Sequence, residues 1–407
     1  MTSDDTLLAM ANHSLKVLGQ PNHLHEIQHC CEIIATELNL SDGSTVSVQA
    51  RKLRSSESLG IVEKAISKFI GRGVESLPSL VREIEGELAI TQSASTRELV
   101  IVSPTSLSLE FVTKFGSPLS IEGQKLTFQE QPTLSKAAED KIREFFLLAS
   151  RGVPPLTNLT WISGTIYARD AHFAFAEFLG LVDRFFALVN YECVGNRVVP
   201  LFKAPLTELR PSRSVFAFEK GKMIQSCVAD VPETYVSGAN PLEPNRLKEI
   251  LNTMYYPLVN GSAKNLLCQA LEVYSSAVTE QDAAFAFLKF WIVVETIAGV
   301  GDFILEKDLK ERVRHYFINK SPAFESEIEV TLQKRNLLVH DGELGSIAHH
   351  DLVFSKVLAD LMLGALWKFT LEKRSISTIR AIFENGGLPE KELDAIKDAI
   401  EYLKTPK

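Results

Sequence analysis

From residue 245 almost to its end, the chain repeats apolar residues with the period of an α-helix, and this pattern constrains the fold most. Such a repeat predicts an all-α part, because a helix places residues three and four apart on one face. We expect helices over 245–256, 263–278, 281–299, 306–317, 322–340, 350–373, 375–384 and 389–403. The segment before them, 237–244, holds Gly, Asn and two prolines and indicates a domain boundary.

The first 240 residues mix two periods. Helical patterns cover 59–69, 80–90, 134–148 and 171–190, and strand-like runs occur at 99–102, 107–111, 125–128, 197–202 and 214–218. We therefore predict an α+β protein with a mixed α/β region over 1–240 and an all-α domain over 241–407. A break near 95–130, where the period changes, would allow two subdomains within the first region.

The charge of the chain is spread evenly along it. Among 407 residues, 43 are Lys or Arg and 51 are Asp or Glu, which gives a net charge of −8. Residues 1–240 and 241–407 each carry −4 of this total. Neither part is a cationic module for binding nucleic acid, so any contact with nucleic acid would have to be local.

Cysteine content and hydropathy predict a cytoplasmic protein. The five cysteines form no CxxC pair, and the acidic, polar N-terminus fits no signal peptide. The most apolar stretch, 283–300, is interrupted by Lys289 and Glu295. A charge near the centre of a membrane-spanning helix costs about 2.5 kcal/mol or more, so we expect a buried helix and no membrane partner.

The most informative segment is the end of the helix predicted over 322–340, which Gly342 would close at its C′ position. Ile328, Leu332, Arg335 and Val339 follow the spacing of one face, which is apolar except for the arginine. An unpaired buried guanidinium would cost several kcal/mol, so Arg335 requires a partner or a ligand. Asn336 and His340 are four residues apart, so a continuous α-helix would place them on an adjacent face.

A matching acid lies in the preceding apolar helix. Leu288, Ile292 and Glu295 are spaced to share one face, on which Glu295 is the one acid. We expect Glu295 to pair with Arg335 or Asn336 and to hold the arginine in a fixed pose.

The run Arg335-Asn336-Leu337-Leu338-Val339-His340 resembles the R-polar-x-x-x-H motif of the HEPN superfamily, over a span from Leu266 to Phe369. The Glu295-bearing helix and the run from Lys334 to Gly342 are most similar to the ApeA-like branch. Gly342 stands where other branches have a Tyr two residues after the His, so those branches are poor models. The resemblance implies a helical bundle that forms a homodimer and acts as a metal-independent endoribonuclease in bacterial antiphage defence or a toxin-like stress response.

These residue types suit RNA cleavage without a metal or cofactor, in which the 2′-OH is the nucleophile. A group with an ordinary pKa near 6.5 can act as general base or acid, which nominates His340. A fixed guanidinium can stabilise charge on the phosphoryl oxygens, which nominates Arg335. Asn336 would orient the histidine or bind phosphate, and Glu295 would hold Arg335. The resemblance implies two motifs facing each other across a dimer cleft, and a 2′,3′-cyclic phosphate product.

Two other interpretations remain open. In the first, the bundle is a non-catalytic dimerisation or ligand-binding module, Arg335 and Glu295 form a structural pair, and His340 only ends a helix. In the second, the protein is a small-ligand sensor whose functional site lies in residues 1–240. Even in a nuclease, that region could bind a trigger ligand or protein and restrain the catalyst.

Three further patterns carry weaker signals. The sequence His25-Glu26-Ile27-Gln28-His29 fits the zinc motif HExxH, with Glu57 or Glu63 as a third ligand, but we favour an ordinary helix surface and assign no metal. We expect His349-His350-Asp351 to begin a helix. The cations at 307, 310, 312 and 314 alternate with acids, which is typical of a solvated face, although Arg312 and Arg314 could guide an RNA backbone.

Overall fold

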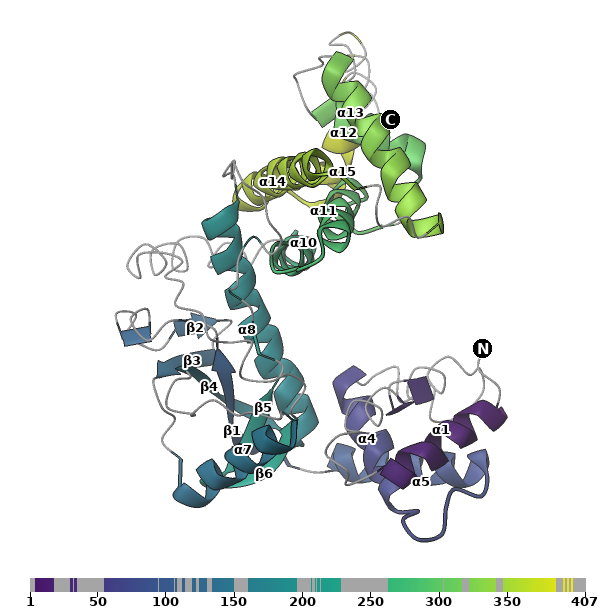
Figure 1. Cartoon of the computed structure of the whole chain (residues 1–407), viewed down its shortest axis with the longest axis vertical. Coiled ribbons are helices and arrows are strands. Elements are labelled where there is room, and N and C mark those ends of the chain that lie inside the picture. Colours follow the sequence, from purple (N-terminus) through teal and green to yellow (C-terminus); the bar gives the residue numbers. More distant parts are fainter. Residues whose placement is uncertain are drawn as a thin grey trace, which may run out of the picture. The chain divides into compact units, whose positions relative to one another are not determined.

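The computed structural model separates the chain into two compact units (Figure 1), of which the first comprises residues 1–182 and 211–240 and the second 183–210 and 241–407. The division that we expect at residue 240 leaves 183–210 with the first part, whereas the structure groups them with the second. The structure describes residues 4–17, 30–31, 33–34, 55–93, 95–105, 107, 112–113, 119–121, 124–129, 134–149, 160–195, 206, 209, 211–212, 214–227, 263–302, 304–316, 322–341, 347–385, 391, 394 and 397.

The first unit begins with a cluster of helices. Helices α1 (Asp4–Val17), α4 (Ser55–Ser67) and α5 (Leu77–Ser93) bury small and aliphatic side chains against one another. Asn12 joins them to the turn before α5, because its amide donates to the carbonyl of Val74 at 3.0 Å and accepts from the Val74 N–H at 2.8 Å. The two backbone groups of Val74 are thereby satisfied away from regular structure.

A six-stranded antiparallel sheet follows, with strand order β2-β3-β4-β1-β5-β6. Its central pair is β1 (Arg97–Thr105) and β4 (Thr160–Ala168), which are in register over their whole length from Arg97 opposite Ala168 to Thr105 opposite Thr160. The flanking strands are β2 (Leu119–Ile121), β3 (Gln124–Gln129), β5 (Val215–Glu219) and β6 (Lys222–Cys227).

Two helices cover opposite faces of this sheet (Figure 1). Helix α7 (Lys136–Ala149) packs on the face that carries Val102, Trp161 and Phe216. Helix α8 (Ala171–Val194) packs on the other face, where Gly164 of β4 lies against its Phe178. A Cβ atom on Gly164 would lie 3.2 Å from side-chain atoms of both Leu126 and Phe178, so the glycine is needed for close packing of helix on sheet.

We expect Gly164→Val to lower the free energy of unfolding by about 1–3 kcal/mol, because the added methyl groups overpack a filled interface. The matched control is Gly180→Ala in α8, where an added Cβ meets nothing within 4 Å. That substitution should stabilise the helix by about 0.5–1 kcal/mol. Urea unfolding of both variants measures the difference, and equal midpoints would show that Gly164 is not needed for packing.

The second unit is helical in every element that the structure describes. It contains the last part of α8, and then α10 (Lys264–Val278), α11 (Ala283–Ala298), α12 (Glu306–Tyr316), α13 (Pro322–Asn336), a π-helical turn (Leu337–Asp341), α14 (His349–Leu371) and α15 (Ile376–Asn385). Helix α11 packs between α10 and α14, and α12 packs on α15. Nine side chains of α11 are buried, which confirms the buried helix expected over 283–300. Among the described helices, none combines the length and the apolarity that crossing a membrane requires.

The core of the second unit contains aromatic rings and a buried charge pair. Tyr191 of α8 stacks on Trp367 and meets Tyr274 edge to face, which explains why this end of α8 belongs to the second unit. The Tyr274 hydroxyl donates to Asp360 at 2.5 Å, and the same carboxylate binds Lys356 at 2.5 Å. Burial, followed by the negative charge and hydrogen bond of Asp360, raises the pKa of Tyr274 well above its ordinary value.

The α+β class is confirmed, and most expected elements are present. Three strands, β2, β4 and β6, were not predicted from the sequence. The central one, β4, is buried along most of its length, so it lacks the alternation that marks a half-buried strand, and Gly164 interrupts it. The helices expected over 245–256 and 389–403 and the strand expected over 197–202 lie wholly or mostly outside the described residues, as does most of 107–111.

Candidate functional site

Helix α11 places Glu295 in its last turn. Asp282 caps the start of the helix by accepting from the N–H groups of Ala284 at 2.8 Å and Phe285 at 3.0 Å. At the other end, the backbone turns so sharply that a Cβ atom on residue 299 would lie 2.3 Å from the carbonyl oxygen of Asp302. Only glycine fits this position, and Gly299 therefore ends the helix. These two ends set the length of α11 and therefore the position of Glu295 on it.

Arg335 of α13 pairs with Glu295 across the two helices, as the sequence predicts. The Nη2 atom of Arg335 lies 3.0 Å from Oε1 of Glu295, and the indole N–H of Trp291 donates to the same oxygen at 2.9 Å. About a quarter of each charged side chain is exposed, so the pair is partly desolvated and not sealed in the core. The Nε atom of Arg335 is buried and has no hydrogen-bond partner within the part of the chain that the structure describes.

Asn336 extends this arrangement to a third helix. Its side-chain oxygen accepts from Nη1 of Arg335 at 3.2 Å, and its amide donates to Glu306 of α12 at 3.0 Å. We call Trp291, Glu295, Glu306, Arg335 and Asn336 the Arg335 cluster. Because Glu295 and Asn336 each bind one end of the guanidinium, the cluster holds Arg335 in a fixed orientation, as expected from its place on an apolar face.

His340 lies in the π-helical turn that follows α13, and its side chain is exposed. No hydrogen bond or ion pair connects it to the Arg335 cluster among the described residues. The expectation that Asn336 and His340 share a face assumed a continuous α-helix, whereas the turn at 337–341 is wound with i→i+5 bonds. The structure therefore brings Arg335, Asn336 and Glu295 together and leaves His340 beside them on the surface.

The same π turn corrects the apolar face predicted for this helix. Ile328 and Leu332 are buried as expected, but Val339 is 46 % exposed and Leu338 takes the buried position. Gly342, which we expect to end the helix, lies outside the described residues.

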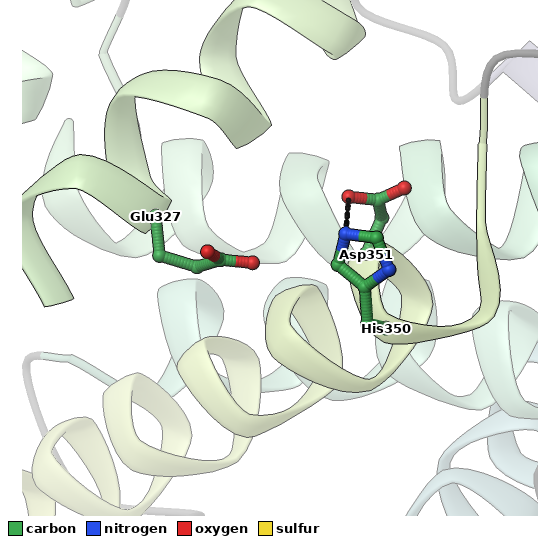
Figure 2. Close-up of side chains that lie close together, drawn as sticks. All are labelled: Glu327, His350 and Asp351. Atoms are coloured by element: carbon green, nitrogen blue, oxygen red, sulfur yellow. Dashed lines mark ion pairs between the residues drawn. The ribbon is translucent and has the colours of Figure 1, made fainter. Parts of the chain in front are cut away.

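Next to Arg335, an adjacent face of α13 meets the start of α14. The Lys334 ammonium lies 2.6 Å from Asp351, whose other contacts form the first turn of α14, and that helix begins at His349 as predicted. Glu327 of α13, His350 and Asp351 also lie close together (Figure 2). Nothing in the sequence alone links Glu327 to the two later residues.

The cations of α12 are mostly bound within the protein. Lys310 pairs with Glu329, Arg314 pairs with Glu325 at 2.6 Å, and Arg312 contacts Glu384 and the carbonyl of Ala298, both at 2.7 Å. The hydrogen bond to Glu325 raises the pKa of Arg314. This favours the mixed-charge face expected from the sequence over a surface that guides RNA.

The HExxH segment at 25–29 lies outside the described residues. Of the two acids that could supply a third zinc ligand, Glu63 lies 3.2 Å from Nε2 of His172. Burial opposes ionisation of Glu63, but the hydrogen bond and charge of His172 outweigh it and lower the pKa of Glu63. Glu63 therefore has a partner within the first unit.

The chain was compared with known proteins at three levels. No protein-family model, no curated protein and no solved structure matches it.

Proposed function

We propose that this protein is a metal-independent endoribonuclease of the HEPN type, with Arg335 and His340 as its catalytic residues. The observation that carries the proposal is the Arg335 cluster: a guanidinium oriented by Glu295 and Asn336, five residues before an exposed histidine in a π turn.

The roles of the residues follow from these contacts. Two nitrogens of Arg335 are bound by Glu295 and Asn336, and a guanidinium has further N–H donors that can bind phosphoryl oxygens. His340 is open to solvent, so its imidazole can reach a substrate and exchange protons. Asn336 and Glu295 act as positioning residues for the arginine.

A homodimer would complete the site. Two large apolar side chains beside His340, Leu337 and Val339, are 39 % and 46 % exposed, and Ile292 of α11, one turn before Glu295, is 37 % exposed. A second copy would cover these side chains and bring two motifs together. The trigger that residues 1–240 would bind stays a prediction.

The test is RNA cleavage by the purified full-length protein in the presence of EDTA. We expect the wild type to cleave and His340→Ala to lose activity by about 100–10,000-fold, because a general acid–base contributes this much. The matched control is His349→Ala, which removes another exposed imidazole and should leave cleavage unchanged. Equal activity in wild type and His340→Ala, or none in either, would contradict the proposal.

The second candidate is a non-catalytic HEPN-like dimerisation module. It is favoured by the lack of a described contact between His340 and the Arg335 cluster, since Glu295 and Asn336 already give the partly buried arginine structural partners. This candidate predicts that the protein sediments as a dimer and that Val339→Glu converts the dimer to a monomer. It also predicts that the protein cleaves no RNA. The EDTA assay separates the two.

A further inference from the structure

We propose that Glu327, His350 and Asp351 form a binding site for a divalent transition metal of the Zn²⁺ class. One ligand atom from each of these side chains lies within 4.8 Å of the other two. Figure 2 shows the Glu327 carboxylate extending from α13 toward the imidazole of His350 and the carboxylate of Asp351, which stand at the start of α14. The site is separate from the Arg335 cluster and does not rest on the proposed nuclease function.

Asp351 is the central ligand because its side chain is buried and only one of its two carboxylate oxygens accepts hydrogen bonds. Its side chain is fully buried, and Oδ2 accepts from the Lys334 ammonium at 2.6 Å and from the Ala348 N–H at 2.7 Å. Its other oxygen, Oδ1, is buried and accepts no hydrogen bond among the described residues, and the group that faces it is Nε2 of His350, an ion-pair partner at 3.1 Å. A buried carboxylate oxygen requires a positive partner or a donor, and a cation bound between Oδ1 and the imidazole would supply one.

The geometry around Oδ1 suits a metal. The Nε2 atom of His350 lies 3.1 Å from Oδ1 of Asp351. Ligand distances of about 2.0–2.1 Å in a tetrahedral Zn²⁺ site place neighbouring ligand atoms roughly 3.3 Å apart. Glu327 would supply the third ligand after a small side-chain rotation, and water would fill the fourth position. The hydrogen bonds to Oδ2 would remain and hold Asp351 in place, as outer partners of metal ligands generally do.

The donor set determines which ion fits. One imidazole and two carboxylates, with no thiolate, suit Zn²⁺ or a similar first-row ion, whereas Mg²⁺ and Ca²⁺ prefer oxygen ligands alone. Thr331, whose buried hydroxyl has no hydrogen bond within the described chain, shares the α13 face of Glu327 and Lys334 by spacing and could bind a metal-bound water. The ion would join α13 at Glu327, eight residues before Arg335, to the first turn of α14.

The experiment is titration of metal-free, full-length protein with Zn²⁺ against a chromophoric chelator, followed by Co²⁺ absorption spectroscopy. We expect one Zn²⁺ bound through nitrogen and oxygen, and an affinity at least about 10-fold lower in both His350→Ala and Glu327→Gln. His349→Ala, which removes the adjacent imidazole, should bind as the wild type does. These two variants avoid Asp351, whose loss would also remove the contacts at the start of α14.

Three results would overturn the proposal. The first is a wild-type protein that binds no Zn²⁺, and the second is binding that neither His350→Ala nor Glu327→Gln weakens. The third is binding that only the double substitution His25→Ala/His29→Ala removes, or that gives Co²⁺ a thiolate charge-transfer band. RNA cleavage is not a readout here, so failure of this site and failure of the nuclease proposal are distinguishable.

Discussion

Arg335→Ala is expected to lower RNA cleavage by about 100–1,000-fold, which is the loss seen when a group that stabilises developing charge is removed. The guanidinium is held by Glu295 at 3.0 Å and by Asn336 at 3.2 Å, so it is oriented before substrate arrives and needs little reorganisation in the transition state. Arg335→Lys keeps the charge but loses the planar fork, and should recover only a small part of the activity. Single-turnover cleavage of RNA in EDTA measures both variants.

The control separates catalysis from folding. Glu295→Gln removes the charge partner but retains an acceptor for the Trp291 indole, so it should weaken cleavage less than Arg335→Ala does. Gln333→Ala, an exposed position on the same helix, should have no effect. If Arg335→Ala and Glu295→Gln lower the unfolding midpoint equally and leave cleavage intact, the ion pair is structural and the catalytic role of Arg335 is wrong.

Asp360→Ala is expected to lower the free energy of unfolding by about 3–5 kcal/mol, the cost of removing one member of a buried ion pair. Lys356 and Asp360 are almost fully buried, and their charged atoms lie 2.5 Å apart. The substitution also removes the acceptor of the Tyr274 hydroxyl. Urea unfolding followed by tryptophan fluorescence reports this change, because Trp291 and Trp367 lie in the same unit.

Two further variants show whether burial is the cause. Glu372→Ala breaks the exposed Glu372–Arg374 pair and should cost less than about 1 kcal/mol. The double substitution Lys356→Met/Asp360→Leu removes both buried charges and should restore most of the stability lost in Asp360→Ala. Equal costs for Asp360→Ala and Glu372→Ala would contradict the assignment of Lys356 and Asp360 as an energetically important buried pair.

The sequence alone correctly identified Arg335 and Glu295, the charged pair of the Arg335 cluster. Arg335 and Glu295 were recognisable because each is a charge on an otherwise apolar helical face, and a charge in such a position requires a partner. That argument depends only on helical spacing, so it held when the two helices were placed together. The prediction for His340 and Val339 depended on unbroken α-helical winding, whereas both residues lie exposed in a π turn at 337–341.

Local spacing determined most helices of the second unit, the strands β1, β3 and β5 and the Glu295–Arg335 pair, because each depends on which side chains share a face. Tertiary structure alone decided the central strand β4, the buried Tyr274–Asp360–Lys356 group and the meeting of Glu327 with Asp351. These features join residues from separate elements, and their side chains are brought together only when the helices pack. The spacing of residues along one helix or strand does not determine which other element packs against it. The proposed metal site could therefore not be predicted from the sequence.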